Sequence, residues 1–535
     1  MSFRRVFDKK KEAKKLSINK EILKENGSSF LHRNLKDNLQ HIRTEVGNSP
    51  DVVIREFEIG GLQLQAAAVF IDNLVDQKLV DDFVMRSLMV DISQGTSKVS
   101  DKNVFDVIKD KALTIGTVKV IKDWNGLMLS ILSGDTIILI EGWAEAISGS
   151  TRGGESRGVE EPSSQVVIRG PKDGFTESIG TNVSLVRRRI KSPNLWLETM
   201  KIGDVTQTDV AFMYIKGIAN DKLVQEVKQR LNDIEIDGVL ESGYIEDLIQ
   251  DQPFSPFPTV YNTERPDSVA ANLLEGRIAI LVDGTPFVLI APTTFFMFFQ
   301  SSEDYYQRYD IATAVRLLRF FAFFISLFGP SIYVAAITFH QEMIPTPLLI
   351  SLSAQREGVP FPAFVEALLM EGSFEILREA GVRMPRAIGQ AVSIVGALVL
   401  GQAAVQAGIV SSAMVIVVAI TGIASFSTPT FNMAISVRLL RFLLTICAAT
   451  YGFYGIAVIN MIMIAHLCSL RSFGIPYMAP LAPFIPSDQK DTLVRLPFWS
   501  LITRPRLVSQ KKITRMERDQ QPLPPKQKKG NTDES

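Results

Sequence analysis

The chain has few of the residues from which catalytic or metal sites are built. Its 535 residues include two cysteines and four histidines. Cys447 and Cys468 lie in one apolar run, so we expect buried thiols and not a disulfide framework. The histidines are far apart or lack Cys and carboxylate partners at ligand spacing, so no metal site is indicated. No nucleophile elbow, dinucleotide fingerprint, phosphate-binding loop or zincin motif occurs. The sequence therefore predicts no enzyme and no cofactor.

The chain also lacks an excess of charge of either sign. Lys and Arg number 57 and Asp and Glu also number 57, so nothing favours nucleic acid as a partner. The basic N-terminal stretch has no apolar core, so we expect no secretory signal peptide. The mean hydropathy of +0.15 averages two different regions. Residues up to about 276 resemble a soluble protein, whereas residues 292–470 contain long apolar runs.

The soluble half predicts two small α/β subdomains, residues 31–160 and 161–255, after a basic disordered arm at residues 1–30. In the first subdomain, helical and alternating patterns follow one another along the chain. We expect helices near 31–46, 72–89, 104–113 and 124–134, and strands at 51–59, 62–71, 117–121 and 135–143. The Gly- and Ser-rich stretch 148–164 has the composition of a linker.

The second subdomain shows a strand–helix–strand–helix order. Residues 208–215 and 236–240 are the expected strands, and 220–234 and 242–250 the expected helices. This spacing predicts a right-handed βαβ unit. Residues 276–292 are hydrophobic enough for a membrane helix, but Asp283-Gly284 is a hairpin turn pair and Pro286 opposes a continuous helix. We therefore predict a β-hairpin there, close to the membrane surface.

Residues 256–505 predict an α-helical membrane domain with about four spans, before a disordered basic tail at 506–535. The expected spans lie near 312–339, 387–406, 409–427 and 437–469. The last run is longer than a span requires, so we expect it to tilt or protrude. Val-Arg-Leu-Leu-Arg-Phe occurs at 315–320 and again at 437–442, which hints at a shared role as an interface anchor, with chance repetition as the alternative.

Orientation follows from the basic residues. Both termini are basic, and an even span number places both on the cytoplasmic side. With four spans, however, four arginines begin helices from the outer side, which the positive-inside rule opposes. These residues are Arg383, Arg386, Arg438 and Arg441. If the helix at 361–377 also crossed, these arginines would lie inside, but the basic tail would then lie outside.

The helix expected after Met384 has two different faces. One is a stripe of small residues at four-residue steps, which lets another helix come close in lipid. These residues are Gly389, Ser393, Ala397 and Gly401. The other face carries a valine row that ends in two glutamines. These residues are Val392, Val395, Val399, Gln402 and Gln406. Such a face is suited to line a hydrophobically gated pore. An ordinary bundle helix with interhelical hydrogen bonds is the alternative.

A row of carboxylates precedes this helix. Glu371, Glu375 and Glu379 share one helical side at four-residue steps. The row is either a solvated helix face or an acidic ring at a pore mouth that attracts cations.

Several long stretches resemble one family, the A subunits of GerA-type spore germinant receptors. The similar stretches are SLVRRRIKSPNL, FMYIKGIAN, residues 251–308, residues 355–411, GIPYMAPLAPF and DTLVRLP. Together they cover about Gly180 to Pro505. The related A-like protein of the spoVA operon shares the membrane core and is the neighbouring possibility.

The resemblance implies a location and partners. Such subunits lie in the inner membrane of the bacterial spore as multi-pass proteins, with a transporter-like B subunit and a lipoprotein C subunit. They are expected to form pentamers that act as a nutrient-gated ion channel, whose opening releases cations and starts germination. A non-conducting scaffold and a transporter component of the same receptor are the alternatives.

Overall fold

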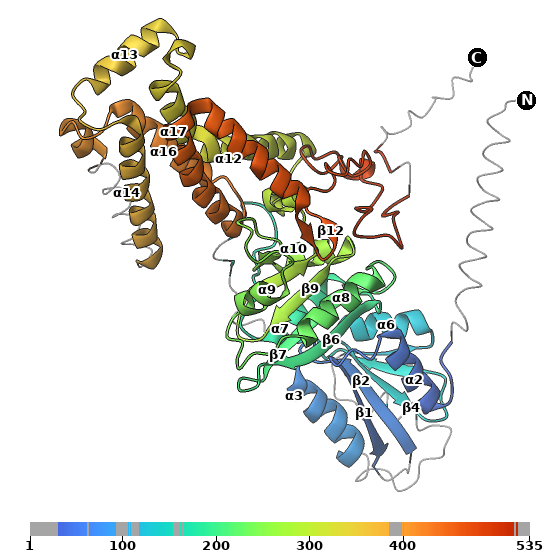
Figure 1. Cartoon of the computed structure of the whole chain (residues 1–535). Coiled ribbons are helices and arrows are strands. Elements are labelled where there is room, and N and C mark those ends of the chain that lie inside the picture. The colour runs from blue at the N-terminus through green and yellow to red at the C-terminus, as the bar shows by residue number, and fades with distance from the viewer. Residues whose placement is uncertain are drawn as a thin grey trace, which may run out of the picture. The chain divides into compact units, whose positions relative to one another are not determined.

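The structure is a computed structural model that describes residues 30–60, 64–91, 117–153, 161–162, 165–384, 401–517 and 520–522, with Phe105, Ile108 and Val399. Two compact units emerge (Figure 1). The first comprises Met1–Glu160, Gly174–Lys216 and Ile280–Pro286, and the second Glu161–Asp173, Gly217–Ala279 and Phe287–Ser535. The domain boundaries expected from the sequence stay predictions. The expected N-terminal arm and nearly all of the 104–113 helix lie outside the described residues.

A five-stranded sheet forms the core of the first unit. Its order is β1-β2-β4-β5-β3, from β1 (Val52–Ile59), β2 (Leu64–Ile71), β3 (Val118–Ile121), β4 (Thr136–Ile140) and β5 (Ala146–Gly149). Neighbouring strands are antiparallel, and the β1–β2 register pairs Val52 with Ile71 and Ile59 with Leu64. The sequence predicted four of these strands. It missed β5, because Gly149 and the serines beside it match a linker in composition.

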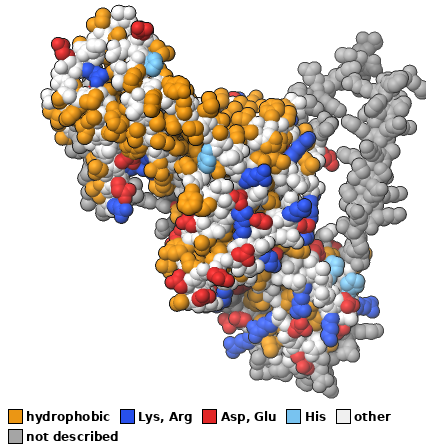
Figure 2. All heavy atoms as spheres, viewed as in Figure 1, with side chains coloured by type: hydrophobic (Ala, Val, Ile, Leu, Met, Phe, Trp, Pro, Cys, Tyr) orange, Lys and Arg blue, Asp and Glu red, His pale blue; other side chains and the backbone are white. Residues whose placement is uncertain are grey.

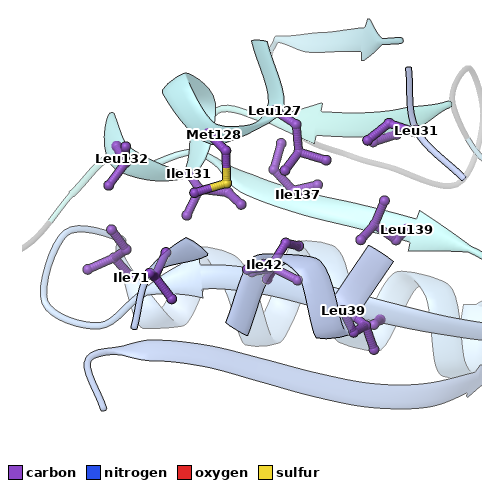
Figure 3. Packing of buried hydrophobic residues seen from close by; sticks show 14 of the residues in the cluster. Leu31, Leu39, Ile42, Ile71, Leu127, Met128, Ile131, Leu132, Ile137 and Leu139 are labelled. Atoms are coloured by element: carbon purple, nitrogen blue, oxygen red, sulfur yellow. The ribbon is translucent and has the colours of Figure 1, made fainter. Parts of the chain in front are cut away.

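Both faces of this sheet are covered at its central strands, β2 and β4. Successive side chains of β2 point to opposite faces, so they join two separate clusters. Ala67, Val69 and Ile71 pack under helices α2 (Leu35–Glu45) and α6 (Trp124–Leu132), as Figure 3 shows for Ile71. Ala66, Ala68 and Phe70 join a second cluster with residues of the segment 75–88. That segment begins with α3 (Gln77–Leu79) and continues as π-helical turns, Val80–Met85 and Ser87–Asp91. The expected helix 72–89 is thus present from Gln77 onward, mostly as π-helical turns with i→i+5 hydrogen bonds.

A second five-stranded sheet has the order β6-β7-β9-β10-β8. Its strands are β6 (Leu195–Ile202), β7 (Thr208–Ile215), β8 (Tyr261–Thr263), β9 (Ile278–Val282) and β10 (Val288–Ala291). Its helices are α7 (Ile179–Arg189), α8 (Asp221–Asn232), α9 (Ser242–Ile249) and α10 (Pro266–Leu274). Strands β9 and β10 confirm the predicted hairpin, and Gly284 in its turn has a φ of 85°.

The predicted βαβ unit is wrong. Residues 236–240 are not a strand, and only Val239 of this stretch is buried, so it offers no alternating buried face. Between β7 and the next strand lie helices α8 and α9, and that next strand, β8, pairs antiparallel with β10. The sequence also missed β6 and α7.

The C-terminal half is helical, as predicted, and hydrophobic side chains cover much of its surface in Figure 2. Its helices are α11 (Glu303–Tyr306), α12 (Tyr309–Thr338), α13 (Thr346–Arg356), α14 (Ala363–Arg383), α16 (Ser412–Ser425) and α17 (Phe431–Ser469). Among the described residues, α12 and α17 are long and apolar enough to cross a membrane. Helix α12 matches the first expected span. Helix α16 is a shorter apolar helix within the third, and most of the span 387–406 lies outside the described residues.

Short elements connect and follow these helices. They are the 3-10 turns Phe295–Phe299, Gln341–Met343 and Phe498–Ser500, and the two-stranded ribbon of β11 (Arg471–Ser472) and β12 (Ile475–Pro476). All five residues of the first turn are buried, so its aromatic side chains pack inside the protein.

Helix α17 is broken at Gly452, where φ is 58° and ψ is −141°. A Cβ atom placed on Gly455 would lie 2.3 Å from the carbonyl oxygen of Cys447. Eight residues of straight helix advance about 12 Å, so the chain bends sharply at this point. The expectation of one tilted or protruding helix over 437–469 is therefore corrected to two helices. Cys447 is half-buried and Cys468 exposed, which also corrects the expectation of two buried thiols.

Candidate functional site

The predicted pore helix is described only at its C-terminal end. Val392, Val395, Gly389, Ser393 and Ala397 lie outside the described residues.

At the described end the two faces differ in exposure. Gly401 is buried, and a Cβ atom there would lie 3.5 Å from Val415 of α16. Val399 is 57% exposed, and Gln402 and Gln406 are also exposed. One small residue thus faces a neighbouring helix, while the described residues of the Val–Gln face are exposed. The assignment of pore-lining and packing faces stays a prediction.

The acidic row on α14 lies in three different environments. Glu371 is 1% exposed, and among the described residues neither of its carboxylate oxygens has a hydrogen-bond partner. Glu375 is partly buried, whereas Glu379 is exposed and pairs with Arg383 one turn later in the same helix. Two of the three carboxylates therefore point into the protein.

These two carboxylates meet the arginines at the start of α17. Arg438 donates to Glu375 at 2.9 Å, and Arg441 donates to the same carboxylate at 3.2 Å. The Nε atom of Arg441 also lies 3.3 Å from Glu371. We call these four residues the α14–α17 charge cluster. Truncating one member of a buried ion pair typically costs about 3–5 kcal/mol, because a buried charge is left without a partner. The cluster therefore holds α14 against α17.

The N-terminal end of α14 is fixed by a further carboxylate, that of Glu366. Glu366 is fully buried and accepts hydrogen bonds from the backbone N–H and the hydroxyl of Ser411, at 2.9 and 2.8 Å. Arg356, at the end of α13, lies 3.3 Å from the same carboxylate. Since Ser411 is the N-cap of α16, Glu366 joins the beginnings of α14 and α16.

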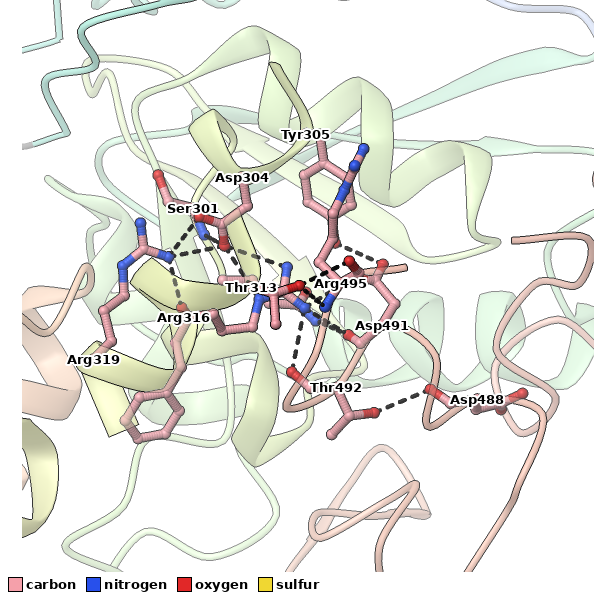
Figure 4. A network of polar contacts seen from close by, with 12 residues as sticks. Ser301, Asp304, Tyr305, Thr313, Arg316, Arg319, Asp488, Asp491, Thr492 and Arg495 are labelled. Carbon is pink, nitrogen blue, oxygen red and sulfur yellow. Dashed lines mark hydrogen bonds and ion pairs between the residues drawn. The ribbon is translucent and has the colours of Figure 1, made fainter. Parts of the chain in front are cut away.

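A second buried polar network lies at the base of α12, drawn in Figure 4. Arg316 is fully buried and bonds Asp304 at 3.2 Å and Asp491 at 2.9 Å. Arg319 approaches the same Asp304 at 2.7 Å, and the Tyr305 hydroxyl donates to Asp491 at 2.8 Å. We call this set of residues the α12 joint. It connects α11, α12 and the segment that follows α17.

Burial shapes the chemistry of this joint. It raises the pKa of the Tyr305 hydroxyl well above 10, and the neighbouring Asp491 carboxylate raises that pKa further. Tyr305 therefore remains a neutral hydrogen-bond donor. Charge-assisted hydrogen bonds from an arginine to a carboxylate are about twice as strong as neutral ones. The arrangement is suited to hold the helix rigidly and not to transfer protons.

The joint continues into the α/β residues of the second unit. The Tyr306 hydroxyl donates to Asp267 at 2.6 Å, and Asp267 is paired with Arg265 at 2.8 Å. Both charged side chains are buried at the start of α10. A displacement of α10 would therefore move α11, and through Asp304 the base of α12.

One sequence feature indicates both networks. The repeated hexapeptide supplies Arg316 and Arg319 in its first copy and Arg438 and Arg441 in its second. In each copy, arginines three residues apart share one helix face and bind one carboxylate, Asp304 in the first copy and Glu375 in the second. Glu375 was noted in the acidic row, but its pairing with these arginines was missed, as were Asp304 and Asp491. Among the described residues no group of three or more His, Cys, Asp and Glu side chains is placed to hold a metal ion.

The comparison with known protein families identifies the chain. Residues 40–507 match the family described as Bacillus/Clostridium GerA spore germination protein. The chain belongs to this family. The resemblance noted in the sequence is therefore confirmed.

Individual GerA relatives match over nearly their whole length. Spore germination protein KA of Bacillus subtilis (strain 168) is 56% identical over 92% of this chain and 89% of its own. Spore germination protein GerLA of Bacillus cereus is 40% identical over 90% of this chain and 97% of its own. The uncharacterized membrane protein YfkQ of Bacillus subtilis (strain 168) is 44% identical over 92% and 95%.

A solved structure is similar to part of the chain. The N-terminal domain of the A subunit of the Bacillus megaterium spore germinant receptor GerK3 is 49% identical, with a TM-score of 0.41, and the match covers 50% of this chain and 99% of that one.

Proposed function

We propose that this chain is the A-type membrane subunit of a spore germinant receptor and that copies of it form a nutrient-gated ion channel. In this proposal it lies in the inner membrane of the spore and acts with a B subunit that holds the nutrient and a lipoprotein C subunit. Five copies surround the pore. Opening of the pore releases cations from the spore core and starts germination.

The observation that carries the proposal is the α12 joint. A gated channel needs a rigid connection between the part that senses and the helices that move. Arg316 is fully buried between Asp304 and Asp491, and Asp304 belongs to the helix whose Tyr306 contacts Asp267 of the α/β part. This rigid connection supports the transfer of a movement of the α/β part to α12.

The α14–α17 charge cluster and Glu366 support a gate in the next segment. They fix α14 at two levels, directly before the predicted pore helix. The small face of that helix then packs on a neighbour and leaves the valine row to the axis. A ring of valines a few ångströms wide holds no stable water column, so it blocks ions until the helices tilt or rotate.

Ion flux tests the proposal. Full-length protein is reconstituted into potassium-loaded vesicles, and efflux is measured without nutrient. Val395→Ala and Val392→Ala widen the ring in every copy, so these variants should leak at least tenfold faster than the parent. Val418→Ala is the control, since it removes the same two methyl groups from a buried position on α16.

Two results would contradict the proposal. If leakage follows a change at Gly401 but not the valine variants, the two faces are assigned the wrong way round. If no valine variant conducts although the protein remains folded and oligomeric, the chain is a scaffold for other receptor subunits.

A further inference from the structure

Both ends of α17 contact the same part of the second unit. At its start, Thr430 donates a hydrogen bond to the carbonyl of Phe298 at 3.2 Å. Just past its end, Ser472 donates to the carbonyl of Thr259 at 2.7 Å, and His466 in its last turn is bonded to Ser255 at 2.9 Å. The acceptor segments are neighbours, because the rings of Tyr261 and Phe298 are 5.8 Å apart. The two ends of α17 therefore lie beside the same part of the second unit.

The break at Gly452 lies between these two ends of α17. A Cβ atom on Gly452 would lie 2.6 Å from the ring of His340, and that ring is 4.9 Å from the ring of Phe453. His340 directly follows α12, whose first turns hold the α12 joint. The turn of α17 thus lies at the opposite end of α12 from the joint.

We propose that α17 crosses the bilayer twice, as two helices that turn at Gly452 in the far headgroup region. The first half, 431–451, has 21 residues, and the second, 453–469, has 17. At 1.5 Å per residue they extend about 31 and 25 Å, against a hydrocarbon core of about 30 Å. Both lengths fall in the range of 17–25 residues that is usual for a transmembrane helix.

The side chains on the two halves fit this placement. Each half exposes a set of large apolar residues that a single chain leaves uncovered, which are Leu439, Leu443, Ile446, Val458, Met461, Ile462 and Ile464. At the turn the exposed residues are tyrosines, Tyr451 at 67% and Tyr454 at 72%. Tyrosine is enriched at membrane–water interfaces, where its ring contacts lipid and its hydroxyl contacts water. The occupant of this surface is therefore lipid, with headgroups around the turn.

The arginines agree with two crossings of α17. Helices α14 and α16 run in the same direction, since Glu366 meets Ser411 at their beginnings and Arg378 meets Ser425 at their ends, 2.6 Å apart. Their ends lie beside the start of α17, where Arg438 contacts Glu375. The end of α14, which carries Arg383, is thus on the side of the α/β residues of its unit.

Two crossings are an even number, so the chain after α17 returns to the side on which α17 begins. The hydrogen bonds of Thr430 to Phe298 and of Ser472 to Thr259 place both ends beside the α/β residues of their unit. This inference rests on the proposed membrane location but not on ion conduction.

Cysteine labelling tests it in intact cells that express the full-length chain. A Cys447→Ala background keeps Cys468, which is exposed at the end of α17, as one natural probe. In a background that lacks Cys447 and Cys468, single cysteines replace Phe431 or Tyr454. Tyr451→Cys in the same background serves as a second probe of the turn. An impermeant maleimide should label Tyr454→Cys at least tenfold faster than Cys468 or Phe431→Cys. The two end positions should react only after permeabilisation.

Each other pattern has a defined meaning. If Cys468 and Phe431→Cys lie on opposite sides, α17 crosses once and the inference is overturned. If both turn positions stay unlabelled in intact and permeabilised cells, the turn stops inside the bilayer, which also overturns it. The reverse pattern, with only the two ends labelled, keeps two crossings and overturns the cytoplasmic orientation instead.

Discussion

Asp304 should be the most sensitive position of the α12 joint. It is 2% exposed and accepts hydrogen bonds from two arginines, Arg316 at 3.2 Å and Arg319 at 2.7 Å. Asp304→Asn keeps the shape and removes the charge, so both guanidinium groups lose their shared counter-ion. Breaking a buried pair costs about 3–5 kcal/mol, and the lower end applies because Arg316 keeps Asp491. We expect a loss of about 3 kcal/mol in the free energy of unfolding.

The opposite truncation should cost less. Arg316→Met leaves Asp304 with Arg319, and it leaves the partly exposed Asp491 carboxylate with solvent and the Tyr305 hydroxyl. We expect a loss of about 1–2 kcal/mol. The control is Asp310→Asn, which breaks the exposed pair of Asp310 with Arg308, two residues before it. Exposed pairs contribute about 0–1 kcal/mol.

The measurement is urea unfolding of purified full-length protein in detergent micelles. Trp499 is a useful reporter, because it follows Phe498, whose ring lies 6.3 Å from Tyr305 of the joint. The three variants should rank Asp304→Asn, Arg316→Met, Asp310→Asn in order of destabilisation. If Asp310→Asn shifts the midpoint as far as Asp304→Asn, the joint does not hold the base of α12 and the reasoning is refuted.

Three further outcomes are expected. Burial raises the pKa of Glu246 from 4.5 to about 7, so the folded state binds more protons between these values and stability falls as pH rises through them. Glu246→Gln should flatten this part of a plot of unfolding midpoint against pH, and an unchanged slope would contradict it. Gly452→Ala should lower the unfolding temperature through strain of about 1–3 kcal/mol and contact with His340, whereas Gly358→Ala, with no atom within 4 Å, should be neutral. Glu375→Gln should destabilise the membrane domain more than Arg438→Met, because both Arg438 and Arg441 lose their shared carboxylate whereas Glu375 keeps Arg441 when Arg438 is lost, and equal effects would contradict the shared contact.

Local pattern was enough for elements that bury a clear face. Strand β2 was expected because apolar side chains fill both of its faces, and the hairpin of β9 and β10 because Asp283-Gly284 interrupts two β-rich arms. Strand β6 was not predicted, because only three of its eight residues are buried, Leu195, Leu197 and Ile202. Its place in a sheet is set by pairing with β7 and not by its own periodicity.

The pairing of arginines with carboxylates in the two polar networks could not be predicted for a different reason. Arg316 and Asp491 are 175 positions apart, and Arg441 and Glu375 are 66 apart. A sequence shows that an arginine near an apolar run needs a partner, because an unpaired buried charge is costly, but it does not show which carboxylate folds back to it. The acidic row on α14 illustrates this. Its four-residue spacing suggested one solvated or pore-facing side, yet Glu371 and Glu375 face α17.

Hydropathy alone does not show the break in α17. A window average treats 431–469 as one apolar segment, since Gly452 and Gly455 do not lower hydropathy enough to divide it. Backbone geometry distinguishes the cases, because φ of 58° with ψ of −141° is accessible to glycine and strained for other residues. The four-span count stays a prediction. The two crossings proposed for α17 keep both of its ends beside Phe298 and Thr259, and the agreement of these contacts with the backbone break at Gly452 is the strongest argument for that proposal.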